Sequence, residues 1–144
     1  MLFRSGHLVF GTLHTQSAAK TVDRIIDVFP ADQQNKIRQT LSEALKGIVA
    51  QTLFKRSDKK GRVAAFEVLV FNTAVANLVR EGKTHQIQGM IQVGKKYGNQ
   101  QLDDHIMEHV RMKRVTAEDA YDKALDKKKF RTLLAHPPDD DDAL

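Results

Sequence analysis

The pattern of apolar residues changes near residue 72, and this change is the feature of the sequence that most limits its fold. Upstream of it, apolar runs rich in β-branched and aromatic residues alternate with segments whose apolar residues recur at helical spacing. Downstream of it, the spacing is helical throughout. This order predicts an incomplete α/β body over residues 1–72, followed by a helical bundle over residues 73–135.

The α/β body is expected to contain three strands and two helices. A strand is predicted over residues 7–13. The helix after it is marked by apolar residues at helical spacing, which are Ala18, Val22, Ile25, Ile26 and Phe29. Pro30 stops that helix and can start the next one, which is predicted to end near Gly47. Residues 48–54 and 62–71 then form the two strands of a hairpin, joined by the charged turn KRSDKKG.

The second part is predicted to consist of four short helices. Three of them are marked by apolar residues at helical spacing, which are Val75, Leu78 and Val79, then Ile87, Met90 and Ile91, then Leu102, Ile106, Met107 and Val110. Thr116, with Asp119 three residues later, resembles a capping box that opens the fourth. Residues 136–144, HPPDDDDAL, offer too little apolar surface to offset the entropy of ordering, so we expect a disordered acidic tail.

The charge of the chain is positive but unevenly distributed. The formal net charge is +5, and the four acidic residues at 139–142 lie together in the tail. The Lys and Arg residues are scattered among Asp and Glu, without the interleaved aromatic residues of a single-strand binder, so no nucleic-acid partner is expected. The chain has no cysteine, which excludes disulfides and thiolate zinc sites. No apolar run approaches the roughly 18 residues of a transmembrane helix, so we expect a cytoplasmic protein.

Two pairs of histidines raise the question of a metal site. His7 and His14 stand at the two ends of the first predicted strand, where seven residues span roughly 23 Å, too far for one ion. His105 and His109 are one helical turn apart and could share an ion, but no third ligand stands at a convincing position. The sequence therefore predicts no metal site.

Five sequence blocks occur in a fixed order between residues 6 and 134. They are GHLVFGTLHTQSAAKTVDRIIDVFP, LSEALKGIVAQTL, GRVAAFEVLV, REGKTHQIQGMIQVGKKYG and LDDHI. Together they resemble the C-terminal half of a type IV pilus retraction ATPase, a twitching-motility motor of the secretion-ATPase superfamily. Many extension and secretion relatives carry a four-cysteine zinc loop where this chain has the turn KRSDKKG, and this difference favours the retraction branch.

The resemblance implies roles for two sets of residues. In this family the first block is a histidine box, so His14 is implied to sense the terminal phosphate of a nucleotide, with His7 as its companion. The stretch AVANLVRE matches a helix typical of the retraction branch. The residues of this retraction-motif helix that match are Ala74, Asn77, Leu78, Arg80 and Glu81. Ala76 stands where the family motif has its first arginine.

The resemblance also implies a fold, cofactors and partners. The implied fold is the C-terminal part of a P-loop, RecA-like ATPase domain, and the cofactors of the full-length proteins are ATP and Mg²⁺. The implied partners are ATPase subunits in a homo-hexameric ring and the pilus platform of the inner membrane, to which the motor is peripheral. This chain holds no GxxxxGK[ST] motif and no apolar strand that ends in the acidic residue that organises magnesium. We therefore expect the chain to be the detached second half of a motor. By itself it should bind no cofactor and should not turn over ATP. A second interpretation stays open, in which the chain is a non-enzymatic interaction module that binds motor subunits or the pilus base.

Overall fold

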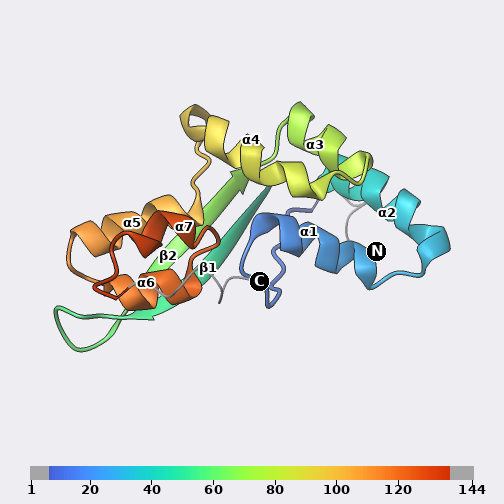
Figure 1. Cartoon of the computed structure of the whole chain (residues 1–144). Coiled ribbons are helices and arrows are strands. Elements are labelled where there is room, and N and C mark those ends of the chain that lie inside the picture. The colour runs from blue at the N-terminus through green and yellow to red at the C-terminus, as the bar shows by residue number, and fades with distance from the viewer. Residues whose placement is uncertain (1–6, 137–144) are drawn as a thin grey trace.

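The centre of the protein is a long β-hairpin. A computed structural model describes residues 7–136 of the 144-residue chain. Strands β1 (Gly47–Lys55) and β2 (Arg62–Val70) pair antiparallel along their whole length, and the helices gather around the two ends of this hairpin (Figure 1). Gly61 closes the turn with a φ of +122°, a conformation that glycine adopts without steric cost. The hairpin predicted from the sequence is confirmed.

Four helices pack at the end of the hairpin that is far from the turn. They are α1 (Ala18–Asp27), α2 (Ala31–Ala44), α3 (Thr73–Arg80) and α4 (Ile87–Val93). Buried apolar residues of α1, α3 and α4 form one core with Ile48 of β1 and Leu69 of β2, and α2 packs its partly buried Ile37 and Leu41 against this core. The short helical turns η2 (Thr84–Gln86) and η3 (Lys95–Tyr97) precede and follow α4. Helix α2 ends before the predicted boundary, because Gly47 and Ile48 belong to β1.

Three helices pack on the hairpin nearer its turn. They are α5 (Leu102–Arg111), α6 (Ala117–Lys123) and α7 (Lys128–Arg131). A second core joins them to Phe54 of β1 and Ala65 of β2. The predicted cap of α6 is present, since the Thr116 side chain accepts a hydrogen bond from the Asp119 amide at 3.1 Å. Helix α7 was not predicted, because its sequence KKFR has a single apolar residue, the fully buried Phe130, and one such residue shows no periodicity.

The outer edge of β2 is covered by the segment that leads into α5. Val68 exchanges two backbone hydrogen bonds with Gln100, each 2.9 Å long. Next to it, the Val70 amide donates to the side-chain oxygen of Asn99 at 2.8 Å. Because an uncovered strand edge can pair with another chain, these contacts both protect the edge and fix the second core against the hairpin.

The outer edge of β1 is open in its middle. In the antiparallel register, Val49, Gln51 and Leu53 stand opposite β2 residues whose backbone groups face outward, so their own backbone groups also face outward. The Leu53 carbonyl accepts a hydrogen bond from the Lys123 ammonium at 2.8 Å. Within residues 7–136, the outward backbone groups of Val49 and Gln51 have no hydrogen-bond partner. This edge is therefore available to a further strand.

The prediction of a strand over residues 7–13 is wrong for the described structure. These residues adopt no regular secondary structure, and their apolar side chains are uncovered, with Leu8 74% and Phe10 89% exposed. A strand needs a neighbour for its backbone hydrogen bonds, and the sheet of the described residues consists of β1 and β2 alone. The apolar composition of this segment predicts a strand, but within the described residues its backbone pairs with neither β1 nor β2.

The division of the chain at residue 72 stays a prediction. Each of the two cores draws residues from both sides of that position, because the hairpin contributes to both. The predicted acidic tail lies almost wholly outside the described residues, which end at residue 136. No helix in the described part of the chain is long and apolar enough to cross a membrane.

Candidate functional site

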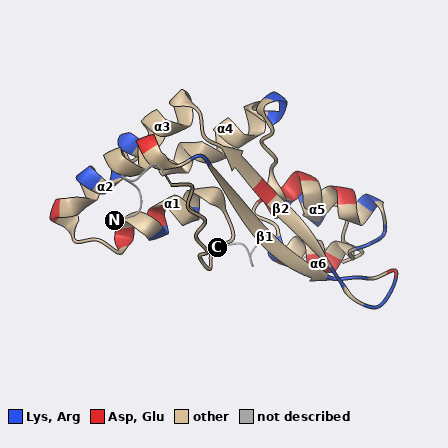
Figure 2. Ribbon diagram, turned by 180° about the vertical axis from the view of Figure 1, so that it is seen from behind, with Lys and Arg blue, Asp and Glu red and all other residues tan. Residues whose placement is uncertain are grey.

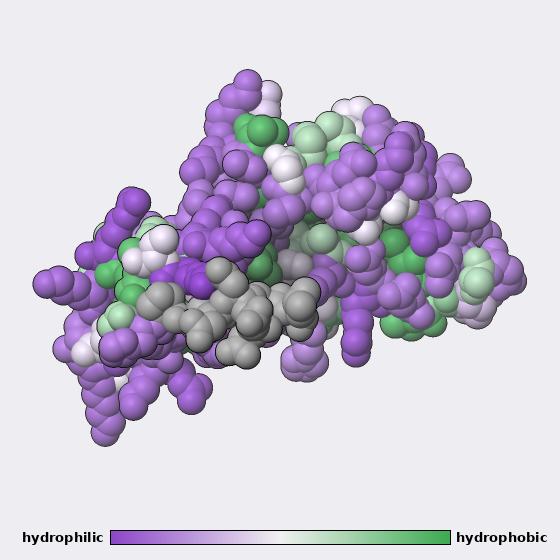
Figure 3. Space-filling model, in the orientation of Figure 1, coloured by the Kyte–Doolittle hydropathy of each residue, from purple (hydrophilic) through white to green (hydrophobic). Residues whose placement is uncertain are grey.

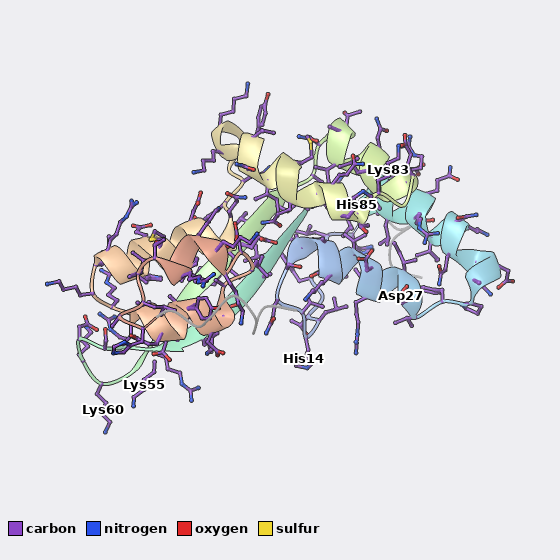
Figure 4. The ribbon with its side chains drawn as sticks, viewed as in Figure 1. His14, Asp27, Lys55, Lys60, Lys83 and His85 are labelled. Carbon is purple, nitrogen blue, oxygen red and sulfur yellow. The ribbon has the colours of Figure 1, made fainter. Side chains whose placement is uncertain are left out.

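His14 lies at the mouth of a shallow hollow beside the start of α1. The helix begins at Ala18 because the Ser17 side chain accepts a hydrogen bond from the Lys20 amide at 3.3 Å. His14 is exposed and points away from the body of the protein (Figure 4). The hollow has a volume of about 440 Å³ and is lined by His14, Thr15, Gln16, Lys20, Asp23, Arg24 and Asp27. An imidazole placed here can donate a hydrogen bond to a phosphate that approaches from outside the chain.

A second hollow lies between α1, β1 and α6. Its volume is about 550 Å³. It is lined by Gln16, Lys20, Gln51, Thr52, Leu53, Asp122, Lys123, Ala124 and Leu125. Gln16 and Lys20 line both hollows, so the start of α1 stands between His14 and the open edge of β1.

Glu67 holds the start of α1 from inside the protein. Its carboxylate is fully buried on β2, accepts a hydrogen bond from the Ala18 amide at 2.8 Å and receives a second from the Gln88 side chain of α4 at 3.3 Å. Burial raises the pKa of Glu67, and these hydrogen bonds oppose the rise. Periodicity did not single out Glu67, although an acidic residue inside the apolar strand RVAAFEVLV is a visible signal of a buried carboxylate.

His7 is exposed in the same extended segment as His14, but it does not line the hollow. The described residues contain no group of three or more His, Asp or Glu side chains that could hold a metal ion. Both histidines are candidates for sensing a nucleotide phosphate because of the family resemblance. Of the two, His14 lines the hollow.

The retraction-motif helix is α3, and it lies away from the His14 hollow. Ala74, Asn77 and Arg80 are exposed, and Leu78 is partly buried against the first core. The Arg80 guanidinium donates to Asn77 at 3.2 Å. Just beyond the helix, Glu81 pairs with Lys83 at 2.7 Å, which lowers the pKa of the Glu81 carboxyl. Ala76, on the same helix, is partly buried. None of these α3 residues lines either hollow.

His105 and His109 form a stacked pair that binds the edge of β2. Their ring centroids are 4.7 Å apart. His105 Nδ1 accepts a hydrogen bond from the Phe66 amide at 3.1 Å, and His109 Nε2 lies 3.0 Å from the Ala64 carbonyl, to which it can only donate. His109 Nδ1 is buried without a partner. The hydrogen bond that His105 Nδ1 accepts requires an unprotonated nitrogen there, and each ring uses one nitrogen to bind the backbone of β2, so the pair is a structural contact.

Burial lowers the pKa of His105, and a charge on the neighbouring His109 would lower it further, while Glu108 opposes the shift. The folded state therefore favours the neutral ring. The stability that the neutral His105 ring contributes is present at pH values above 6.5, the ordinary pKa of histidine. It is lost as the pH falls through the lowered pKa of His105 in the folded state.

Replacing His105 by asparagine is expected to flatten the dependence of stability on pH as the pH falls below 6.5, the ordinary histidine value. The asparagine oxygen can still accept from the Phe66 amide but does not titrate. Urea unfolding at a series of pH values measures the effect, with His85→Asn, a change at an exposed histidine, as the control. If His105→Asn keeps the slope of the unsubstituted chain, the buried ring does not contribute to it.

Comparison with known proteins supports one family. Residues 3–122 match the family described as type II/IV secretion system protein. The chain is 48% identical over 120 residues to a twitching motility protein of Neisseria gonorrhoeae, a match that covers 83% of this chain and 32% of the relative. It is 47% identical over 120 residues to the type IV pilus retraction ATPase PilT of Pseudomonas aeruginosa, covering 83% of this chain and 35% of the relative. The chain thus spans about a third of the length of these relatives.

Solved structures agree with this assignment. A crystal structure of the pilus retraction motor PilT with bound ADP matches 87% of this chain and 34% of its own, with a TM-score of 0.75 and 39% identity. The Yersinia pseudotuberculosis ATPase DotB, at 21% identity and a TM-score of 0.68, covers 91% of this chain and 32% of its own and supports the fold alone. The predicted fold class, part of an α/β ATPase domain, is confirmed. The chain belongs to the type II/IV secretion system protein family, and within it resembles part of the pilus-retraction ATPases.

Proposed function

We propose that this chain is the histidine-bearing part of an ATP-driven motor for type IV pilus retraction and twitching motility. In that motor a separate nucleotide-binding part holds ATP and Mg²⁺, and His14 donates a hydrogen bond to the terminal phosphate and responds when that phosphate leaves. His7 is its companion in the same segment. The chain holds no phosphate-binding loop, so by itself it binds no cofactor and does not turn over ATP.

One observation carries the proposal: the extended segment that holds His14 and the middle of the β1 edge are both uncovered within the described structure. The middle of the β1 edge has free backbone groups at Val49 and Gln51 within the described structure, and Val49 is 65% exposed. The extended segment before α1 exposes Leu8 and Phe10. A sheet edge and an apolar segment of this kind are the surfaces that a larger α/β sheet covers when it extends the hairpin.

A reconstitution experiment tests the proposal. The chain is mixed with the part of Pseudomonas aeruginosa PilT that it does not match, and phosphate release is measured for each part and for the mixture. We expect turnover in the mixture and none for this chain alone. If the two parts co-purify without turnover, the chain is the non-enzymatic interaction module instead, and turnover by this chain alone would contradict the assignment of roles.

The proposed motor is an assembly of several ATPase subunits. The motor is a homo-hexameric ring of ATPase subunits in the cytoplasm, peripheral to the inner membrane, where it acts on the pilus platform. The relatives that match this chain are named for twitching motility and pilus retraction, which supports this setting. Sedimentation of the reconstituted mixture measures the size of the assembly.

Replacing Ala76 by arginine is expected to improve twitching in cells that carry the reconstituted motor. The change restores the cationic side chain that the retraction motif has at this position of α3, and it should alter folding stability by less than about 1 kcal/mol because both residues favour helix. Gln92→Arg, an equal change of charge at an exposed position of α4 outside the retraction-motif helix, is the control. Equal twitching by the two variants, or a large rise in melting temperature with Ala76→Arg, would show that position 76 does not couple the motor to retraction.

A further inference from the structure

Two loops are fixed to one another at the turn end of the hairpin. One is the turn between β1 and β2, and the other joins α5 to α6. Ser57 connects them, because its amide donates to the Arg114 carbonyl at 2.9 Å and its hydroxyl donates to the Lys113 carbonyl at 2.8 Å. Lys113, in the second loop, adopts a positive φ of 56°, which is uncommon for a residue other than glycine. The two loops therefore present one surface.

This surface is strongly basic, and we define it as the basic end, residues 55–62 and 111–114. Eight of these twelve residues are Lys or Arg: Lys55, Arg56, Lys59, Lys60, Arg62, Arg111, Lys113 and Arg114. Its one acidic residue, Asp58, pairs with Arg56 at 2.6 Å, and this pair lowers the pKa of Asp58 to about 2. The nearest acidic residues in the sequence are Glu43 and Glu67 around residues 55–62, and Glu108 and Glu118 around residues 111–114. The structure thus brings together two basic runs that lie about 50 residues apart in the sequence.

The basic end projects from the protein. Figure 2 shows Lys and Arg along the hairpin turn and along the loop after α5. Lys55 and Lys60 point outward from the hairpin, and long hydrophilic side chains extend from this end in the space-filling view (Figures 3 and 4). Met112, between two basic residues, is 49% exposed. The twelve residues include no aromatic side chain on which a nucleobase could stack.

We propose that the basic end binds the surface of a bilayer that contains anionic lipids. A projecting, flexible set of ammonium and guanidinium groups suits a flat surface with many phosphate groups, to which basic clusters are attracted. Met112 can enter the boundary between headgroups and acyl chains while the charges around it stay among the phosphates. The negative surface potential falls off within a Debye length, so binding weakens as salt is added. This contact is separate from ATP hydrolysis, and it orients the His14 hollow relative to the membrane.

Vesicle co-sedimentation with the whole chain tests the inference. We expect the chain to sediment with phosphatidylcholine vesicles that contain phosphatidylglycerol and not with phosphatidylcholine alone, and salt should release it. The double variant Lys59→Gln with Lys60→Gln should weaken binding about tenfold. The control is Lys36→Gln with Lys46→Gln, which removes the same charge from two exposed positions outside the basic end. Circular dichroism confirms that both variants are folded.

Three results would overturn the inference. The first is no sedimentation with the anionic vesicles at low salt, and the second is an equal loss of binding in the control variant. The third is tighter binding to duplex DNA or to polyglutamate than to the vesicles, which would assign the surface to a nucleic acid or an acidic protein. Because none of these measurements requires ATP turnover, each leaves the proposed motor function to its own test.

Discussion

Replacing His14 by alanine is expected to lower kcat for ATP hydrolysis by about a hundredfold in the reconstituted motor, with little change in KM. In the proposed function the imidazole donates to the terminal phosphate as charge develops there, whereas the bulk of nucleotide binding comes from the other part of the motor. His14 is exposed at the end of an extended segment, so its loss leaves the fold of this chain intact. Steady-state phosphate release over a range of ATP concentrations separates the two constants.

His85→Ala is the matched control, because His85 is also exposed but lies between short helices and outside both hollows. It should leave kcat unchanged. A rise in KM without a fall in kcat for His14→Ala would mean that the histidine only helps to bind the nucleotide. No change in either constant would remove His14 from the mechanism, while turnover by the unsubstituted mixture would still support the motor.

Replacing Glu67 by alanine is expected to lower the free energy of unfolding by about 2–4 kcal/mol. The change leaves the buried Ala18 amide without the acceptor that now lies 2.8 Å away, and it also removes the acceptor of Gln88 and opens a cavity beside β2. Urea unfolding of this chain measures the loss. Hydrogen exchange should show its largest increase at the start of α1, because that is where the carboxylate is bound.

Glu67→Gln is the control for this prediction. Its side-chain oxygen can still accept from the Ala18 amide, and its size is nearly unchanged, so we expect a loss of about 1 kcal/mol or less. Faster exchange spread evenly over the chain in Glu67→Ala would indicate a general packing defect. A stability equal to that of the unsubstituted chain would show that the carboxylate does not fix α1.

Periodicity was enough to locate most of the elements. The hairpin, α1 and α3 to α6 lie close to their predicted positions because their apolar residues repeat at strand or helix spacing and their ends carry local signals such as Thr116 and Gly61. The segment with His7 and His14 was predicted as a strand and is not one in the described structure, since pairing depends on a neighbouring strand and not on composition.

The sequence by itself determined the family, most of the elements and the candidate role of His14, because each of these depends on motifs or periods made by residues that are close together in the chain. The tertiary structure alone decided which distant residues meet. It placed Glu67 under the first amide of α1, set His105 and His109 against the edge of β2, and brought two basic loops together through Ser57. The physical reason is that such contacts join groups about 40 to 60 positions apart, whose meeting depends on how the helices pack against the hairpin and leaves no period in the sequence.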